Sequence, residues 1–310
     1  MRVFVAGAGG VIGAPLIAAL LQAGHEVAAM TRDSQRAEQL GRQGTTPVIC
    51  DAYEEASLNA ALEAVEPEVV ISHLTDLAEL NAGRMKEAWL ANDRLRTVGV
   101  PNLVRAAQAA GARRFVVQSI AFIYAPSMDG PADESAPLYL DHPQFGATVR
   151  AALAMERSVL EAEGIEGVAL RFGFWYGPGT GYAAAAIQAK EVRKRRFPIG
   201  AGGTGVWSWI HLDDVVATSV AALDRGQPGT YNVVDDDPAA VGEWLPAYAA
   251  AIGAKRPLRA PTIAVRLAAG SAGVHMMKTN RGADNSLAKR EFGWTPKYPS
   301  WREGFRDALG

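Results

Sequence analysis

The chain has 310 residues, of which 49% are hydrophobic and 21% charged, and its formal net charge is −2. This length suits a globular protein with a large core and two subdomains, and the charge balance argues against general attraction to nucleic acids or anionic membranes. The single Cys50 excludes an internal disulfide. No apolar run is long enough to span a bilayer, and a strand starting after Arg2 leaves no room for a signal peptide, so we expect a cytoplasmic protein.

The first stretch of interest runs from the apolar residues 3–6 through three glycines into a helix-forming run at 16–21. Gly7 allows a tight turn, Gly10 lets backbone approach a pyrophosphate, and Gly13 permits close helix-to-sheet contact. Flexible loops carry similar glycines, but the flanking strand and helix favour a dinucleotide site at the helix N-terminus. The residues predicted to hold the pyrophosphate are Gly7, Gly9, Gly10, Val11, Ile12 and Gly13.

Strands then alternate with helices. Strands are predicted over 26–30, 47–50, 68–72, 114–119 and 168–172, and helices over 34–40, 57–65, 82–110 and 147–163. This alternation predicts an α/β fold of the Rossmann type, with a doubly wound parallel sheet covered on both faces. Beyond residue 172 glycine and proline break the pattern. We therefore expect a boundary between two subdomains near residue 172.

The end of the second strand predicts the cofactor. Arg32 follows this strand directly, where a guanidinium accommodates the 2′-phosphate of NADP(H) and an acidic residue would bind the ribose hydroxyl of NAD(H). Asp33 can instead be the N-cap of the next helix, with Arg32 a plain surface residue. The pattern favours NADP(H). Further cofactor contacts are expected after the third and fourth strands, at Asp51, Ala52, Leu74 and Thr75.

Two other features receive plainer interpretations. His73 ends the fourth strand, where a structural hydrogen bond is favoured over acid/base work, and no cluster has metal-ligand spacing. The basic run Arg193–Arg196 is interpreted as a solvated helix end rather than a binding patch.

Later segments complete a family pattern. They are Arg114-Phe-Val-Val-Gln-Ser119 with Tyr124, Leu170-Arg171-Phe172-Gly173 with Tyr176-Gly177-Pro178-Gly179, Trp209-Ile-His-Leu-Asp213-Asp214-Val215, Tyr231-Asn232-Val233 and Phe292-Gly293-Trp294-Thr295-Pro296. Together with the glycine turn, they make the chain resemble the extended short-chain dehydrogenase/reductase family, also called the NAD-dependent epimerase/dehydratase family, over nearly its whole length.

The resemblance implies hydride transfer with a nicotinamide cofactor in a small-molecule enzyme. It also implies an NAD(P)-binding Rossmann domain over 1–172 and a smaller α+β substrate-binding subdomain over 173–310, with some segments returning to the Rossmann domain. It implies that Ser119 is the catalytic serine and that Gly173 and Phe174 lie against the cofactor. Asp213 and Asp214 would be structural, capping a helix and tying the subdomains together. Family members often dimerise through the helices expected here at 82–110 and 147–163, so we expect a homodimer.

The sequence departs from the family pattern at the acid/base pair. The family's acid/base is a Tyr with a Lys four residues later, and no Tyr in this chain has a Lys at that spacing. Alignment places Thr148 and Ala152 at the two positions, or Phe145 and Val149 if the helix is shifted. A threonine hydroxyl has too high a pKa to exchange protons readily near neutrality.

Three functions follow from this departure. The first, which we favour, is an NADPH-dependent ketoreductase in which Ser119 and Thr148 orient the carbonyl and the proton comes from water or substrate. The second is an NADP(H)-binding regulator without chemistry, and the third a sugar-nucleotide epimerase or dehydratase. The side chains expected around the substrate favour a flat, apolar or aromatic ligand of secondary metabolism over a diphosphosugar, although several can be plain core residues. They are Phe122, Tyr139, Phe145, Phe174, Trp175, Tyr182, Trp207, Met276 and Met277.

Overall fold

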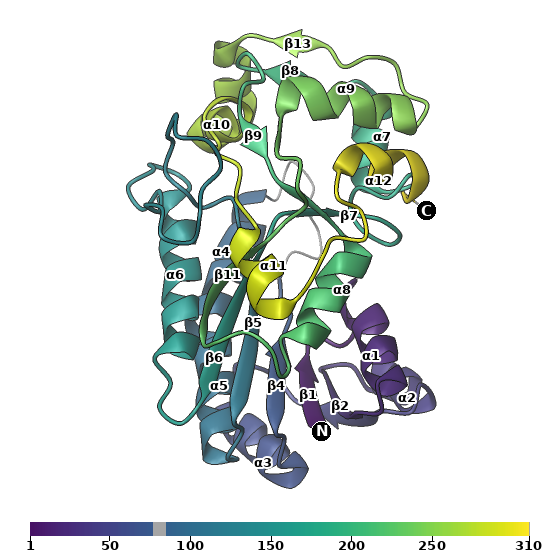
Figure 1. The fold of residues 1–310 in the computed structure, drawn as a ribbon, viewed down its shortest axis with the longest axis vertical. Coiled ribbons are helices and arrows are strands. Elements are labelled where there is room, and N and C mark those ends of the chain that lie inside the picture. Colours follow the sequence, from purple (N-terminus) through teal and green to yellow (C-terminus); the bar gives the residue numbers. More distant parts are fainter. Residues whose placement is uncertain (77–84, 310) are drawn as a thin grey trace. The chain divides into compact units, whose positions relative to one another are not determined.

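The protein is built on a seven-stranded sheet in the order β11-β6-β5-β4-β1-β2-β3 (Figure 1). It is described here from a computed structural model that covers residues 1–76 and 85–309. The strands are β1 Arg2–Ala6, β2 Glu26–Thr31, β3 Thr46–Ile49, β4 Val69–Ser72, β5 Arg114–Ile120, β6 Glu166–Phe172 and β11 Gly229–Val233. The pairs β1–β2, β1–β4, β2–β3 and β4–β5 are parallel. The predicted Rossmann-type fold is confirmed.

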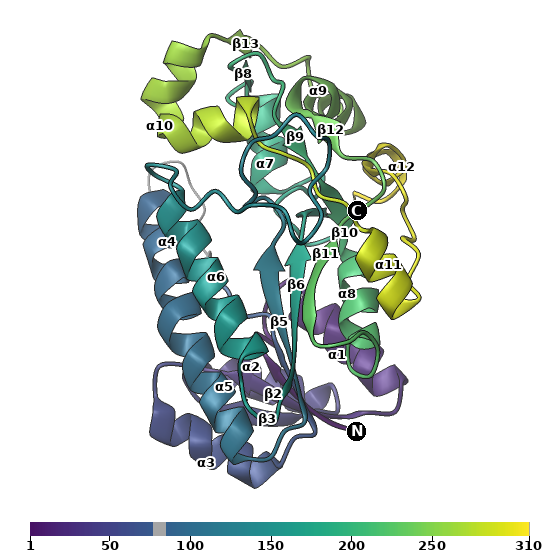
Figure 2. The same cartoon turned by 60° about the vertical axis from the view of Figure 1, so that its left-hand side comes forward.

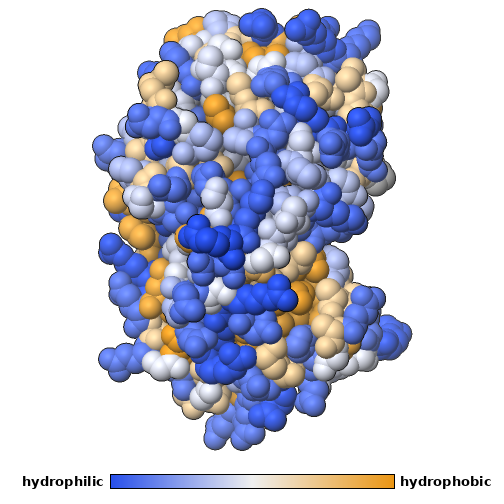
Figure 3. Space-filling view, viewed as in Figure 1, coloured by the Kyte–Doolittle hydropathy of each residue, from blue (hydrophilic) through white to orange (hydrophobic). Residues whose placement is uncertain are grey.

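Helices cover both faces of this sheet. They are α1 Gly13–Gln22, α2 Ser34–Arg42, α3 Glu55–Val65, α4 Met85–Arg94, α5 Val100–Ala109, α6 Gly146–Leu160 and α8 Leu212–Ala221. In Figure 2, α4, α5 and α6 lie on one side of the strands and α1 and α8 on the other. Central strand residues such as Phe4, Val70 and Phe115 are fully buried, whereas the outer face in Figure 3 is mostly hydrophilic. No helix of the described residues is long and apolar enough to cross a membrane.

The helical region predicted over 82–110 is divided. Residues 82–84 of that prediction lie outside the described residues, and a π-helical turn, η1 Leu95–Gly99, separates α4 from α5. Pro101 follows this turn and has no N–H to donate, and its ring would crowd a carbonyl one turn earlier. The wider turn avoids that crowding. Gly111 ends the region with φ +76°.

The remaining elements are short. They are β7 Phe174–Tyr176, α7 Ile187–Arg193, β8 Ile199–Gly200, β9 Val206–Trp207, β10 Trp209–His211, β12 Ala239–Ala240, α9 Val241–Ala251, β13 Arg259–Ala260, α10 Thr262–Lys278, α11 Ser286–Phe292 and α12 Trp301–Asp307. Their core is aromatic, with Trp209, Trp244 and Trp301 all fully buried. The helix α10 has a kink at Gly270, where φ is +66°.

The chain forms two compact units. The first comprises Met1–Ser119, Arg150–Leu170 and Val216–Thr230, and the second comprises Ile120–Val149, Arg171–Val215 and the chain from Tyr231 onward. A single boundary near residue 172 therefore does not describe this division. The segment 120–149 lies before that boundary but packs in the second unit, and 216–230 returns to the first. Tertiary contacts, which chain order does not reveal, decide both assignments.

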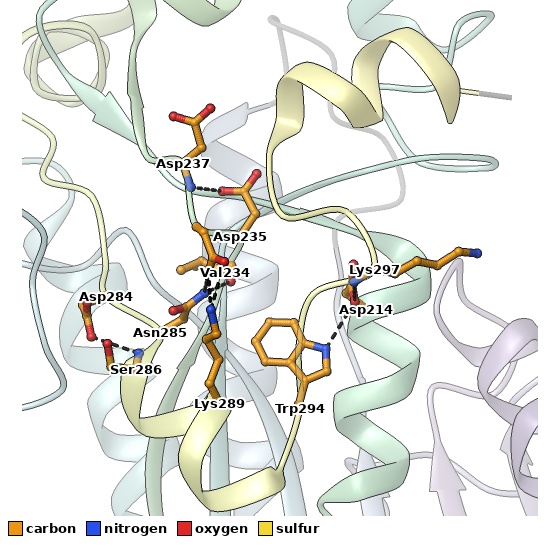
Figure 4. Close-up of polar contacts among 11 residues, drawn as sticks. Asp214, Val234, Asp235, Asp237, Asp284, Asn285, Ser286, Lys289, Trp294 and Lys297 are labelled. Atoms are coloured by element: carbon orange, nitrogen blue, oxygen red, sulfur yellow. Dashed lines mark hydrogen bonds and ion pairs between the residues drawn. The ribbon is translucent and has the colours of Figure 1, made fainter.

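Acidic side chains fasten the C-terminal segment of the second unit (Figure 4). The Asp214 carboxylate accepts hydrogen bonds from Trp294 Nε1 at 3.2 Å and from the backbone N–H of Lys297 at 2.7 Å. Asp213 forms an ion pair with Lys297 Nζ at 2.6 Å. Burial raises the pKa of Asp214, and these donors oppose the rise. Both aspartates thus have structural partners within this unit.

Candidate functional site

The glycine turn after β1 is shaped by three close approaches. Gly7 has φ +90°, and a Cβ there would lie 2.7 Å from the His73 backbone. A Cβ on Gly13 would lie 2.2 Å from the Ala8 carbonyl oxygen, and the Gly10 N–H donates to the Gly7 carbonyl at 3.0 Å. The N-cap residue of α1, Ile12, offers no side-chain acceptor to the first amides of that helix. This is a backbone cradle with a free helix N-terminus, which fits a pyrophosphate.

Parallel register brings the other predicted contacts to the same edge of the sheet. Ala6 is paired with Met30 and with Ser72, and Thr31 is paired with Ile49, so the chain leaves four strands at one level. Leu74 and Thr75 follow β4 there, and a Cβ on Gly7 would come within 3.1 Å of the Leu74 nitrogen. After β3, the Asp51 carboxylate accepts from the Tyr53 N–H at 2.9 Å, and Ala52 is buried.

Arg32 is exposed at this edge. Its Nη1 lies 3.6 Å from Asp51 Oδ2, and about two thirds of its side chain is open to solvent. Asp33 caps α2, because its side chain accepts the Arg36 N–H at 2.8 Å. The N-cap alternative therefore holds for Asp33, while the exposed Arg32 guanidinium lies near the half-buried Asp51 carboxylate.

Arg36 is a candidate that sequence reasoning missed. Its Nη1 donates to the Gly9 carbonyl at 2.7 Å, and a Cβ on Gly9 would lie 2.4 Å from Arg36 Cδ. Gly9 therefore makes room for this side chain, which lies across the glycine turn. The sequence offered a signal, since Arg36 follows Arg32 by four residues and lies in the first turn of the helix predicted over 34–40.

Ser119 is buried and hydrogen-bonded to a carboxylate. Only 1% of the residue is exposed, and its hydroxyl donates to Glu156 Oε1 of α6 at 2.6 Å. Burial lowers the pKa of Arg96, and the carboxylates of Asp93 and Glu156 oppose this. Ser119 thus satisfies a buried carboxylate, which is a positioning role. Its catalytic role stays a prediction.

Three of the family segments meet inside the second unit. Arg171 Nη1 donates to the Tyr124 hydroxyl at 2.9 Å, and that hydroxyl donates to Asn232 Oδ1 at 2.6 Å. The Asn232 Nδ2 donates to the Ala132 carbonyl. These residues are buried and hydrogen-bonded, so their motifs maintain structure rather than present reactive groups.

Aromatic rings form a continuous stack in the second unit. Phe174 stacks on Trp207 with centroids 3.8 Å apart and on Phe122 at 4.5 Å, and Phe145 follows Phe122 at 6.3 Å. Phe122 and Phe174 are half-buried, whereas Phe145 and Trp207 are buried. The structure thus assembles four of the predicted substrate residues.

The other predicted substrate residues are buried or half-buried. Tyr182 packs in the aromatic core, and Met276 and Met277 pack against that core. Trp175 is half-buried. Tyr139 lies edge-on to His275 at 4.9 Å. Burial lowers the pKa of His275 to about 4, and the nearby His142 contributes in the same direction.

A shallow hollow borders the stack. It is lined by Ala121, Phe122, Gly173, Ser208, Asn280 and Arg281. The Asn280 Nδ2 donates to the Val206 carbonyl at 2.7 Å, whereas its buried Oδ1 has no hydrogen-bond partner among the described residues. Gly173 packs against the Ser208 backbone. The predicted cofactor contacts of Gly173 and Phe174 therefore belong to the second unit, and they stay predictions.

His73 has partners on both ring nitrogens. Nδ1 lies 3.1 Å from Gln118 Oε1, and Nε2 lies 3.1 Å from Ser219 Oγ. Burial lowers its pKa to about 4. This supports the structural interpretation of His73. Within residues 1–76 and 85–309, no group of three or more His, Cys, Asp or Glu side chains is placed to hold a metal.

Comparison with known proteins matches the NAD-dependent epimerase/dehydratase family over residues 3–234. The chain belongs to this family. A 3-diazoavenalumate denitrifying reductase of a Streptomyces species is 45% identical over 306 residues, which cover 98% of this chain and 99% of the relative. A 4-hydroxy-2-methyl-3-oxo-4-farnesyl-3,4-dihydroquinoline-1-oxide ketoreductase of Stigmatella aurantiaca is 28% identical over 79% of this chain and 71% of its own. The chain is thus an oxidoreductase related to named reductases.

Solved structures agree on the fold. The human epimerase family protein SDR39U1 (isoform 2), crystallised with NADPH, superposes with a TM-score of 0.77 at 21% identity. The match covers 100% of this chain and 99% of that one. The family itself is described as NAD dependent, so a nicotinamide cofactor is expected of this member.

The residues predicted at the positions of the family's proton relay are buried. Thr148 is 7% exposed in α6, and Ala152, one turn later, is fully buried. The shifted alternatives, Phe145 and Val149, are buried apolar residues. Neither pair supplies a phenol beside an ammonium group, so this helix offers no acid/base of the usual kind.

Proposed function

We propose that this protein is an NADPH-dependent reductase that delivers a hydride to an aromatic or otherwise apolar substrate without a Tyr/Lys pair. The observation that carries the proposal is the glycine cradle, together with a helix, α6, that contains neither Tyr nor Lys and has Thr148 and Ala152 at the positions where we expect the proton relay. Bound NADPH would supply the hydride from C4 of its nicotinamide. The chain's own residues hold the pyrophosphate and the 2′-phosphate and present an apolar surface to the acceptor.

The acceptor that best suits this site is an aromatic diazo compound. A diazonium carbon that gains a hydride loses its C–N bond, so Ar–N₂⁺ and hydride become Ar–H and N₂, and the cofactor's two electrons balance the change. No proton is consumed, so this reaction does not require the missing relay. The 45% identical relative is named as a denitrifying reductase of a diazo compound. Phe122 and Phe174 are half-buried members of the ring stack, and their uncovered parts offer an apolar surface against which an aryl ring can pack.

A carbonyl is the second candidate acceptor, as the relationship to a ketoreductase supports. Carbonyl reduction needs one proton on oxygen. In this chain that proton would come from water or from an acidic group of the substrate, such as a phenol next to the carbonyl, with Thr148 donating a hydrogen bond. Binding of NADP(H) without turnover is the regulatory alternative. A sugar-nucleotide epimerase or dehydratase ranks last, because its chemistry depends most on the Tyr base.

NADPH is proposed over NADH because two guanidinium groups lie at the adenosine end of the cradle. Arg32 is exposed, and Arg36 is held across the turn by the Gly9 carbonyl. Arginine suits a phosphate through its planar set of donors. A comparison of NADPH and NADH dissociation constants tests this preference, and equal affinities would remove it.

The proposal is tested by following NADPH absorbance with an aryl diazonium substrate and with the ketone of the same skeleton, with enzyme-free controls. Oxidation with release of N₂ supports the diazo reductase. Oxidation with the ketone alone selects the ketoreductase, and firm NADPH binding without oxidation selects the regulator. We also propose a cytoplasmic homodimer, for which the molar mass at micromolar concentration is the test.

A further inference from the structure

Two basic segments of the second unit lie side by side. The first follows α7 and continues the run Arg193–Arg196, and the second joins α9 to α10. Their strands β8 and β13 pair in parallel, with Ile199 opposite Arg259. The Arg193 guanidinium donates to the Ile252 carbonyl at 3.0 Å, and Arg195 donates to the Arg256 carbonyl at 3.3 Å. The structure thus joins two segments that lie about 60 residues apart in the sequence.

The combined surface carries a strong positive charge. Residues 190–200 and 252–268 contain nine of the 31 basic side chains but one of the 33 acidic ones. These two segments therefore have a net charge of +8, which leaves −10 for the rest of a chain whose total is −2. All nine residues are exposed. We name them the basic surface: Lys190, Arg193, Lys194, Arg195, Arg196, Lys255, Arg256, Arg259 and Arg266.

Bulky apolar side chains project from the same segments. Leu258 is 47% exposed, Ile263 65% and Leu267 83%. Ile263 and Leu267 lie in the first half of α10. This half packs closely on β8, since a Cβ on Gly200 would lie 2.3 Å from Val265 Cγ2. Figure 3 shows hydrophilic and apolar side chains next to each other at its upper end, over β13 and α9. Cations beside protruding leucine and isoleucine side chains are the pattern of interfacial membrane binding.

The net charge of the whole chain predicts no general attraction to anionic membranes, and the run Arg193–Arg196 alone predicts a solvated helix end. We propose instead that the basic surface, with Leu258, Ile263 and Leu267, docks this protein on anionic lipid bilayers. The cations neutralise lipid headgroups, and the three apolar side chains enter the boundary between headgroups and acyl chains. A bilayer fits better than a nucleic acid, since phosphate contacts alone leave the projecting apolar residues in water. Docking of this kind needs no spanning helix. It is independent of which acceptor the enzyme reduces.

The test is cosedimentation of the full chain with vesicles of phosphatidylcholine alone or of equal parts phosphatidylcholine and phosphatidylglycerol. We expect binding to the anionic vesicles only, weakened by salt. The double variant Lys194→Glu/Lys255→Glu should lower vesicle affinity by roughly tenfold or more, because each basic residue near the surface contributes to binding. The matched control is Arg42→Glu/Arg290→Glu, which makes the same charge change at exposed positions outside the basic surface.

The apolar contribution has its own pair of variants. Leu267→Asp should reduce vesicle binding several-fold, while Met128→Asp, at a residue that is 99% exposed, should not. Circular dichroism checks that all variants remain folded. The proposal fails if the protein ignores anionic vesicles at low salt, or if the basic-surface variant and its control bind alike. Binding to heparin or DNA without binding to vesicles would assign the surface to another polyanion and overturn the bilayer.

Discussion

The two units of this chain are built in different ways. In the first unit the backbone shapes the predicted cofactor site: Gly7 and Gly13 pack against backbone carbonyls, and strand register brings four loops to one edge of the sheet. The second unit relies on side chains, with aromatic rings stacked from Phe122 to Trp207. Backbone-built sites follow local rules that a sequence displays, whereas a ring stack depends on which distant residues meet. Five experiments test this difference between the units.

The largest effect is expected at the glycine turn. Gly13→Val should weaken NADPH binding by roughly 100-fold or more, because its Cβ cannot avoid the Ala8 carbonyl oxygen without moving the cradle. Gly41→Ala in α2 is the control, since a Cβ there makes ordinary contact with Pro47. Titration of cofactor fluorescence measures both. Unchanged binding in Gly13→Val would show that the cradle is not the cofactor site.

Arg36→Ala should raise the dissociation constant of NADPH by roughly tenfold or more and leave that of NADH unchanged, as expected for loss of a charge-assisted contact to phosphate. Arg32→Ala should act in the same way. Arg42→Ala, on the exposed end of the same helix, is the control. Calorimetry with both cofactors separates the outcomes, and equal losses for NADH would mean that Arg36 only maintains the turn.

In the second unit, Phe122→Ala should raise KM for the aromatic substrate about tenfold with little change in NADPH affinity. The reason is that the substitution removes one half-buried ring of the stack, which we expect to contact the substrate. Steady-state kinetics with the substrate varied at saturating NADPH provides the measurement. If kcat and KM stay at their original values, the stack belongs to the core alone.

Stability should depend on acid through the buried histidines. In the folded state, burial lowers the pKa of His275 and of His73 from the ordinary value of 6.5 to about 4. The unfolded chain therefore binds more protons between pH 6.5 and about 4, so the free energy of unfolding falls as the pH is lowered through this window. Urea unfolding at several pH values measures the slope. His275→Gln should flatten the slope, and an unaltered slope would contradict the assignment.

The smallest effect is expected at Ser119. Ser119→Ala should lower kcat only a few-fold and lower the melting temperature by a few degrees, because it leaves the buried Glu156 carboxylate short of one donor. Thr148→Ala should also be modest. If either variant loses most of its activity instead, that residue takes part in catalysis directly.

Much of the first unit could be predicted from sequence, because apolar strands, capping residues and glycines act over short distances. The turn at Gly7, the cap at Asp33 and the sheet edge that carries Asp51 are of this kind. The placement of Arg36 over Gly9 and of segment 120–149 in the second unit could not, since each depends on contacts between distant parts of the chain. The aromatic residues show the same limit: Phe122 and Tyr182 look alike in sequence, yet one is half-buried in a stack and the other packs in the core.

In the proposed reduction of a diazo group, hydride transfer needs no proton from the protein. The direct measurement is the amount of N₂ released per NADPH oxidised when the enzyme is given an aryl diazonium substrate, with the matching ketone assayed in parallel. We expect one N₂ for each NADPH and no reduction of the ketone. Reduction of the ketone with the diazonium compound left intact would contradict this proposal.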